Sequence, residues 1–174
     1  MNYPHLHLMI NHVPVLGTIL ALLLLTWALV TRRRDFIRLS LFITMLAGLS
    51  VYPAFFSGDE AHEQLEDVQG FDHDIVEEHE EAADWALWIL LSTGAVAALG
   101  LWVSRKDREV PRWAGTAALV GLLFSASATA RTAWLGGEIR HPETTGPLWA
   151  PPDVSKSVML DSASAPRHKD HGQD

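Results

Sequence analysis

Four long apolar segments alternate with polar segments along the chain, at about residues 8–30, 36–56, 84–104 and 113–137. Each approaches or exceeds the roughly 20 apolar residues that a helix needs to cross the hydrocarbon layer of a bilayer. The first and third contain long uncharged runs with no polar stripe every three or four residues, unlike the amphipathic helices of soluble proteins. The pattern predicts four transmembrane helices.

The connections between these segments predict how the helices are arranged. Short loops join the first helix to the second and the third to the fourth, which makes neighbouring helices antiparallel. The long polar segment 57–83 is rich in Glu, Ala and His, so we expect helices 2 and 3 to extend outside the membrane, with Gly70 as the break. The expected fold is all-α, an up-down-up-down integral membrane four-helix bundle.

This transmembrane domain is expected to cover residues 1–143, and a polar tail covers residues 144–174. The tail has the Pro, Ser and Asp content of a disordered or surface-lying segment. The N-terminus lacks a positive region and a small-residue cleavage site, so the first apolar segment is interpreted as a retained span.

Basic residues gather in the two short loops, and they predict the orientation. They are Arg32, Arg33, Arg34, Arg38, Arg105, Lys106, Arg108 and Arg112. Lys and Arg in short loops beside a span mark the cytoplasmic side. The segment 57–83 is strongly acidic and contains no Lys or Arg. We therefore expect a bacterial inner-membrane protein with both termini on the periplasmic side.

Composition excludes several classes of function. The net charge is −8 and the basic residues are mainly loop anchors, whereas a nucleic-acid binder needs a basic surface. The absence of cysteine excludes disulfides, thiolate metal sites, c-type haem attachment and cysteine catalysis. No hydrolase motif or phosphate-binding glycine loop is present, and the sequence leaves open whether the protein is an enzyme. The expected partners are the lipid bilayer and a periplasmic or membrane protein.

All nine histidines fall on the outer side in this arrangement, and they suggest a metal site. Glu138 and His141 have the Glu-x-x-His spacing of di-iron carboxylate bundles, and Asp59 and His62 repeat it with the shorter acid. The expected ligands are His12, His79, His141, Glu138, Asp59 and His62, with His5, His7 and Glu60 as additional candidates. Mixed imidazole and carboxylate ligands suit iron, zinc, copper or manganese.

Three alternatives remain open at this stage. One is a b-type haem held by two histidines from different helices, such as His12 with His79 or His141, for electron transfer. Another is a non-enzymatic accessory or assembly subunit whose acidic outer helices dock a partner. In the simplest alternative, the histidines and acids only form a solvated face.

Arg131 lies inside the outer end of the fourth apolar segment. An arginine at membrane depth usually faces the bundle interior and has a partner. We expect a structural ion pair with Asp84, with Asp59 or Glu60 as other candidate partners, that fixes the helix register. The alternative role is binding an anionic group such as a haem propionate.

Several short motifs together resemble a known group of proteins. They are His7-x-x-x-Asn11-His12-x-Pro14-Val15-x-Gly17-Thr18, Ser57-Gly58-Asp59, His79-Glu80-Glu81-Ala82-Ala83 and Leu135-Gly136-Gly137-Glu138-Ile139-Arg140-His141. The chain from about residue 5 to 143 resembles small four-helix bacterial membrane proteins that are largely of unknown function. The resemblance implies the four-helix fold and these residues as the ones of interest, and it implies no established reaction.

Overall fold

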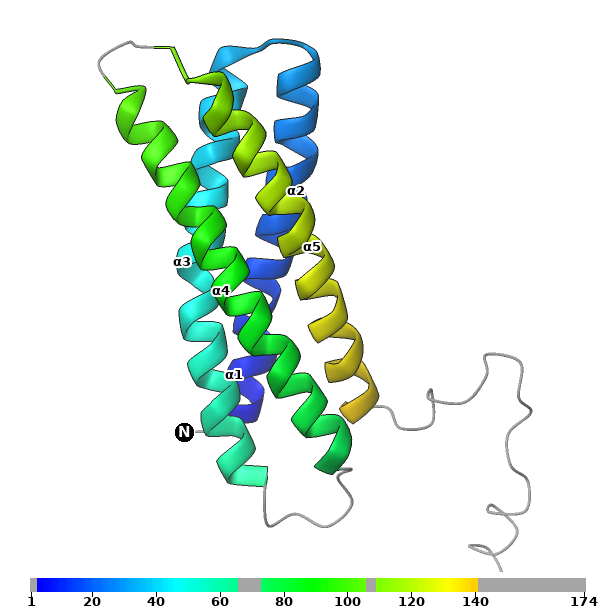
Figure 1. Ribbon diagram of the computed structural model, residues 1–174. Helices are drawn as coiled ribbons and strands as arrows, with labels where there is room; N and C mark the ends of the chain where they lie inside the picture. The colour runs from blue at the N-terminus through cyan, green and yellow to red at the C-terminus, as the bar shows by residue number, and fades with distance from the viewer. Residues whose placement is uncertain (1–2, 66–72, 106–108, 141–174) are drawn as a thin grey trace, which may run out of the picture. The chain divides into compact units, whose positions relative to one another are not determined.

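The computed structural model describes residues 3–65, 73–105 and 109–140, and all regular structure within them is helical. Five helices follow one another there: α1 (Tyr3–Ile10), α2 (His12–Val30), α3 (Arg34–Leu65), α4 (His73–Val103) and α5 (Arg112–Arg140) (Figure 1). The predicted all-α fold is confirmed. Gly70, the predicted break, and the tail 144–174 lie outside the described residues, but α3 and α4 do extend beyond the predicted spans as expected.

The first apolar segment is divided into α1 and α2 by a turn at Asn11. Pro14 explains the break, because its nitrogen has no hydrogen to donate to the carbonyl of Ile10 and its ring clashes with that carbonyl. Nδ1 of His12 donates a hydrogen bond of 2.7 Å to the carbonyl of Leu8 in the preceding turn. His12 is exposed, and this hydrogen bond joins its side chain to the backbone on the other side of the break.

Small residues let the helices approach closely. A β-carbon built on Gly48 in α3 would lie 3.0 Å from Cα of Gly94 in α4, so the two backbones touch there. A β-carbon on Gly121 in α5 would lie 2.6 Å from Oγ1 of Thr93 in α4. Close approach through small residues is typical of helix packing in membranes.

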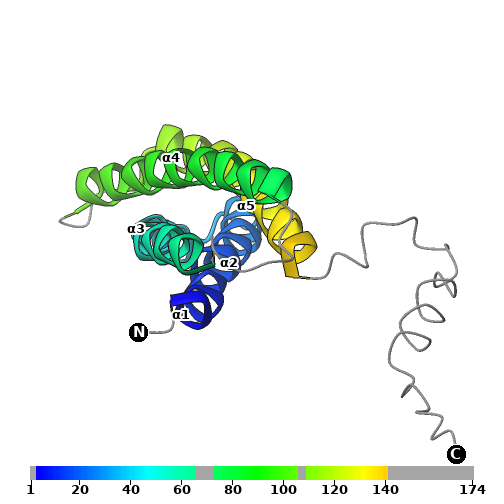
Figure 2. The same cartoon turned by 90° about the horizontal axis from the view of Figure 1, so that it is seen from below.

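The main apolar core joins α2, α3, α4 and α5. It consists of Ala21, Leu25, Leu41, Ala97, Ala118 and Leu122. α4 packs on both α3 and α5, and α2 packs on both as well, whereas α1 contacts α3 and α2. Within the described residues α1 makes no contact with α4 or α5, and Figure 2 shows α1 and α4 on opposite sides of the bundle.

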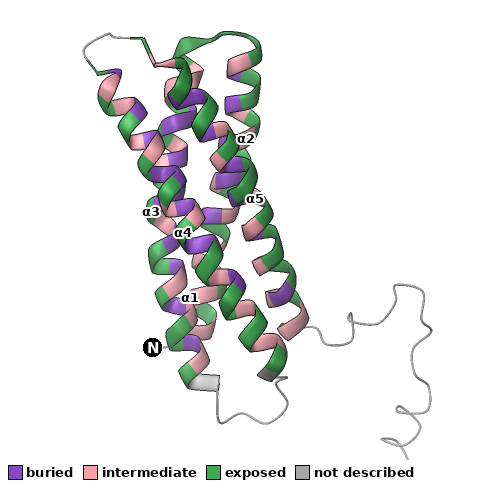
Figure 3. Cartoon of the chain, viewed as in Figure 1, coloured by how far each residue is buried: buried purple, intermediate pink, exposed green. Residues whose placement is uncertain are grey.

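Many large apolar side chains are exposed along the helices, and Figure 3 shows exposed residues over their whole length. Large side chains such as Leu23, Leu49 and Phe124 are exposed in the middle of the helices. Four helical stretches are long and apolar enough to cross a membrane: Tyr3–Val30, Arg34–Glu63, Asp74–Val103 and Arg112–Ile139. A water-soluble bundle would instead carry a polar outer face.

The two ends of the bundle differ in chemistry. At one end, here called the arginine end, Arg38 donates a hydrogen bond of 2.9 Å to the carbonyl of Ser104, and Arg34 pairs with Glu109 at 2.5 Å. The opposite end, here called the histidine end, contains α1, the last turns of α3 and α5 and the first turns of α4 (Figure 1). His62 of α3 pairs there with Glu80 of α4.

Candidate functional site

His7 lies at the contact between α1 and α3, where its half-buried imidazole rests on the α3 backbone. Its Nδ1 lies 2.9 Å from the carbonyl oxygen of Ala54 and 3.2 Å from Oγ of Ser57. A β-carbon built on Gly58 would lie 3.0 Å from Cε1 of His7. Gly58 therefore provides the space that the imidazole occupies.

His79 lies at the contact between α4 and α5 in a matching environment, and it too is half-buried. Its Nδ1 lies 3.0 Å from the carbonyl oxygen of Thr132. A β-carbon built on Gly136 would lie 3.1 Å from Cε1 of His79. In both cases a histidine packs on a neighbouring helix. It contacts a backbone carbonyl of that helix and the glycine four residues after the carbonyl.

These hydrogen bonds determine which ring nitrogen of each neutral imidazole carries the proton. A carbonyl oxygen can only accept, so Nδ1 carries the hydrogen and Nε2 keeps a lone pair. The described residues provide no hydrogen-bond partner for Nε2 of His7 or His79. A backbone carbonyl that binds Nδ1–H is the usual support of a metal-ligating histidine.

The two imidazoles share one region of the histidine end. They are close enough for an electrostatic interaction between them, although they belong to helices that do not touch. The buried side chains around this end include four alanines together with Ser57 and Leu135: the alanines are Ala54, Ala61, Ala82 and Ala86. His7 and His79 thus belong to two separate helix pairs at this end, α1 with α3 and α4 with α5, and each keeps a lone pair on Nε2.

The other predicted ligands are distributed differently. His12, Asp59 and Glu60 are exposed, His62 is paired with Glu80 on α4, and Glu138 is half-buried near the end of α5. His141 lies outside the described residues. Among the residues that the structure describes, no group of three or more His, Asp or Glu side chains could hold a metal ion.

Arg131 and Asp84 are both exposed, and no ion pair joins them. The expected pair is therefore absent from the structure. Arg131 lies three residues before the exposed Trp134 in the last turns of α5. At that level its long side chain can reach the polar boundary of a bilayer, which removes the need for a charged partner.

Sequence reasoning named His7 only as an additional ligand candidate, and it missed the role of Gly58 and Gly136. His5, the other additional candidate, is exposed. The glycines were visible in the motifs near the ends of two spans, Gly58 directly before Asp59 and Gly136 two residues before Glu138. A glycine at a helix end is usually a capping signal, so nothing in the sequence alone indicated that an imidazole packs on it.

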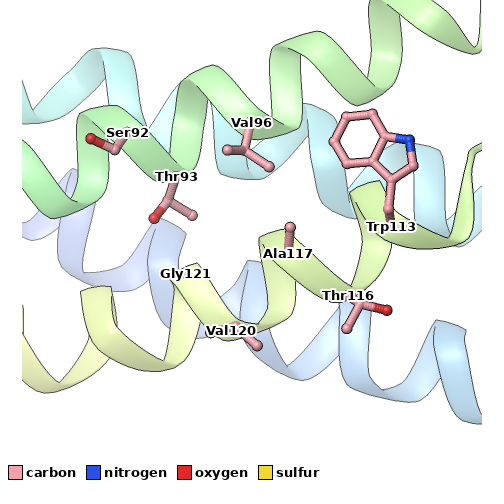
Figure 4. A pocket seen from close by; sticks show the side chains of 8 residues that line it. All are labelled: Ser92, Thr93, Val96, Trp113, Thr116, Ala117, Val120 and Gly121. Carbon is pink, nitrogen blue, oxygen red and sulfur yellow. The ribbon is translucent and has the colours of Figure 1, made fainter.

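A separate surface groove of about 560 Å³ lies between α4 and α5, away from these histidines (Figure 4). Its lining includes Val96, Trp113 and Val120, and its polar side chains are the hydroxyls of Ser92, Thr93 and Thr116. It contains no imidazole or carboxylate, so it is not part of the candidate site.

Comparisons with protein-family models, curated proteins and solved structures found no match to this chain. The resemblance to small four-helix bacterial membrane proteins therefore stays a hypothesis based on the motifs, and the site has to be interpreted from its own geometry.

Proposed function

We propose that this chain is an integral membrane protein that binds a b-type haem between His7 and His79 and transfers electrons. The observation that carries the proposal is the matched support of the two imidazoles. Each donates Nδ1–H to a backbone carbonyl of the neighbouring helix, packs on a glycine and has no hydrogen-bond partner for Nε2 among the described residues. Both nitrogens are thus prepared to ligate one metal centre from opposite helix pairs.

The number of ligands favours haem over a bare metal ion. Zinc sites use three or four protein ligands, whereas haem iron receives four nitrogens from the porphyrin and needs at most two from the protein. No third His, Asp or Glu among the described residues joins His7 and His79. Two imidazoles without a carboxylate suit the axial positions of haem iron.

Tryptophans support insertion in a bilayer. All six in the described residues are exposed: Trp27, Trp85, Trp88, Trp102, Trp113 and Trp134. Trp113 and Trp134 lie at opposite ends of α5, separated by about 32 Å at helical rise. This separation matches the hydrocarbon thickness of about 30 Å, and tryptophans gather at both membrane interfaces.

The proposed orientation follows from charge. The arginine end faces the cytoplasm of a bacterial inner membrane, because Lys and Arg in short loops are retained there. The bundle then runs up-down-up-down with both termini and the histidine end on the periplasmic side. His79 lies six residues before Trp85, so the haem would bind at or just outside the outer membrane interface, within reach of a periplasmic or membrane partner.

Spectroscopy of the purified protein tests this proposal. Protein from a haem-supplemented host should contain haem b and show the absorbance and electron paramagnetic resonance of low-spin iron with two imidazole ligands. His79→Ala and His7→Ala should each abolish the low-spin signal. His12→Ala is the matched control, since His12 is exposed and its Nδ1 bonds to the carbonyl of Leu8 in the preceding turn.

Other results would overturn the proposal. Protein without haem but with stoichiometric iron, zinc, copper or manganese would favour the metal-ion site instead. Absence of both haem and metal would favour an accessory subunit, and a low-spin signal that survives both substitutions would exclude His7 and His79 as the ligands.

A further inference from the structure

The two helical halves of the bundle repeat the same pattern of burial. Five positions of α2 are buried: Pro14, Thr18, Ala21, Leu25 and Ala28. The positions 72 residues later in α4 are all buried as well: Ala86, Leu90, Thr93, Ala97 and Gly100. A constant offset over four turns means that both helices present the same face to the bundle interior.

α3 and α5 show the same relation, with an offset of 78 residues, at five of the nine buried positions described in α3; the counterparts of Leu41, Gly48, Ala54 and Ala61 are half-buried. Ser40, Thr44, Ala47, Val51 and Ser57 are buried in α3. Their counterparts in α5, also buried, are Ala118, Leu122, Ser125, Thr129 and Leu135. Each half of the bundle is therefore one copy of a repeated helical hairpin.

The same two offsets relate the residues of one imidazole site to those of the other. His7 corresponds to His79, and Gly58 corresponds to Gly136. The carbonyl of Ala54, which receives Nδ1–H of His7, corresponds to that of Thr132. Because burial and hydrogen bonding are independent observations, their agreement makes the two histidines equivalent positions of one repeat, and any difference between the halves is then informative.

The helices that carry the two histidines differ. α4 is unbroken from His73 to Val103 and packs on both α3 and α5. His7 belongs to α1, which has eight residues, no buried residue and no contact with α4 or α5 in the described structure. Pro14 separates α1 from α2, whereas its counterpart in the uninterrupted α4 is Ala86.

The energetic consequence follows from packing. Moving His79 away would disrupt a long helix that is packed on two sides and is linked to α3 by the His62–Glu80 pair. Moving His7 requires that α1 leave α3 and α2 and that the hydrogen bond from Nδ1 of His12 to the carbonyl of Leu8 break, with rotation at Asn11, where Pro14 already removes one backbone hydrogen bond of a continuous helix. Elements with little buried surface open first.

We propose that, in the haem protein of the preceding section, His79 is the permanent axial ligand and His7 is an exchangeable one. Displacement of α1 would open one iron position to a neutral diatomic ligand such as carbon monoxide. The bond that the haem iron would make to Nε2 of His7 would break, and a bond between iron and the ligand carbon would form. The iron would stay ferrous, with no transfer of a proton or an electron.

Carbon monoxide binding to the reduced full-length protein tests this inference. The wild-type rate should level off at high carbon monoxide concentration, because release of His7 becomes limiting. His7→Ala should keep its haem as a five-coordinate high-spin species and bind carbon monoxide severalfold faster without levelling off. His79→Ala should lose most of its haem while its helical content, measured by circular dichroism, remains that of the wild type.

Pro14→Ala provides a test that leaves both ligands in place. Joining α1 and α2 into one helix should slow carbon monoxide binding severalfold and leave the low-spin spectrum unchanged. The inference is wrong if the two histidine variants behave alike, if only His79→Ala retains haem, or if Pro14→Ala binds at the wild-type rate. In each of those cases a low-spin wild-type spectrum would still support the proposed haem, whereas wild-type protein without haem would reject both proposals.

Discussion

Gly136 and Gly137 are adjacent glycines of α5 with different surroundings. A β-carbon on Gly136 would lie 3.1 Å from Cε1 of His79, whereas one on Gly137 would meet nothing within 4 Å. The same helix therefore contains a glycine that supports an imidazole and, next to it, one that does not. This pair offers a matched test of whether the support of His79 matters for function.

We predict that Gly136→Val lowers haem occupancy and Gly137→Val does not. The side chain at position 136 would push the imidazole away from the carbonyl of Thr132, and lost outer-shell support typically costs about 10- to 100-fold in metal affinity. Haem content per protein, together with the low-spin signal, measures the effect. Both substitutions place the same residue in the same helix, so equal losses in the two variants would contradict the role of Gly136.

Histidines close together in sequence also differ in environment. Nδ1 of His12 donates to a carbonyl of its own chain segment, and that of His7 reaches across to α3. Both were candidates by sequence, with His12 preferred because it is deeper in the apolar segment. Depth along a helix does not determine which face turns toward the neighbouring helix, and here the less favoured histidine packs on α3 whereas His12 is exposed.

At the scale of elements, the contact between α3 and α4 depends on two facing glycines. A β-carbon on Gly48 would lie 3.0 Å from both Cα of Gly94 and the carbonyl oxygen of Leu90. Both neighbours are backbone atoms, which cannot move without separating the helices. A β-carbon built on Gly115 would instead lie nearest to Cδ2 of Leu29, at 3.2 Å, which is the far end of a flexible side chain.

We predict that Gly48→Ala destabilises the bundle by about 1 kcal/mol or more, as overpacking of a close contact usually does. Gly115→Ala should be neutral or stabilising, because alanine favours helix by about 1 kcal/mol over glycine. Thermal unfolding in detergent, followed by circular dichroism, compares the two. A more stable Gly48→Ala protein would show that the helices do not depend on this contact.

At the scale of the whole molecule, the charge asymmetry predicts a topology that can be tested with unique labels. The chain has no cysteine, so a single introduced cysteine is the only reactive thiol. Thr31 and Glu63 are exposed at the arginine end and the histidine end. A membrane-impermeant maleimide added to spheroplasts should label Glu63→Cys and should label Thr31→Cys only after the membrane is permeabilised.

Labelling of Thr31→Cys in intact spheroplasts, with Glu63→Cys protected, would reverse the proposed orientation. It would also move the proposed haem to the cytoplasmic side. Labelling of both positions without permeabilisation would argue against a spanning bundle altogether.

Much of the fold could be predicted from the sequence because it depends on local properties. Whether a segment is long and apolar enough to cross a membrane follows from its own residues. The second and fourth predicted spans lie within α3 and α5, the third ends one residue past α4, and the first is divided between α1 and α2. The division of the first apolar segment at Asn11 follows from Pro14, whose nitrogen has no hydrogen to donate. The conformational preference of a proline is a local property, whereas the path of the chain before it is not determined locally.

The sequence by itself determined an all-helical chain with four long apolar stretches, basic loops at one end and histidines at the other, because hydropathy and helix propensity act over neighbouring residues. Only the tertiary structure decided which imidazoles pack on a neighbouring helix. The Glu138-x-x-His141 and Asp59-x-x-His62 spacings describe one face of one helix, and they contain no information on the rotation of that helix against its neighbours. That rotation is set by glycines and small side chains at helix contacts, which turn His7 and His79 inward and leave His12 and Asp59 exposed.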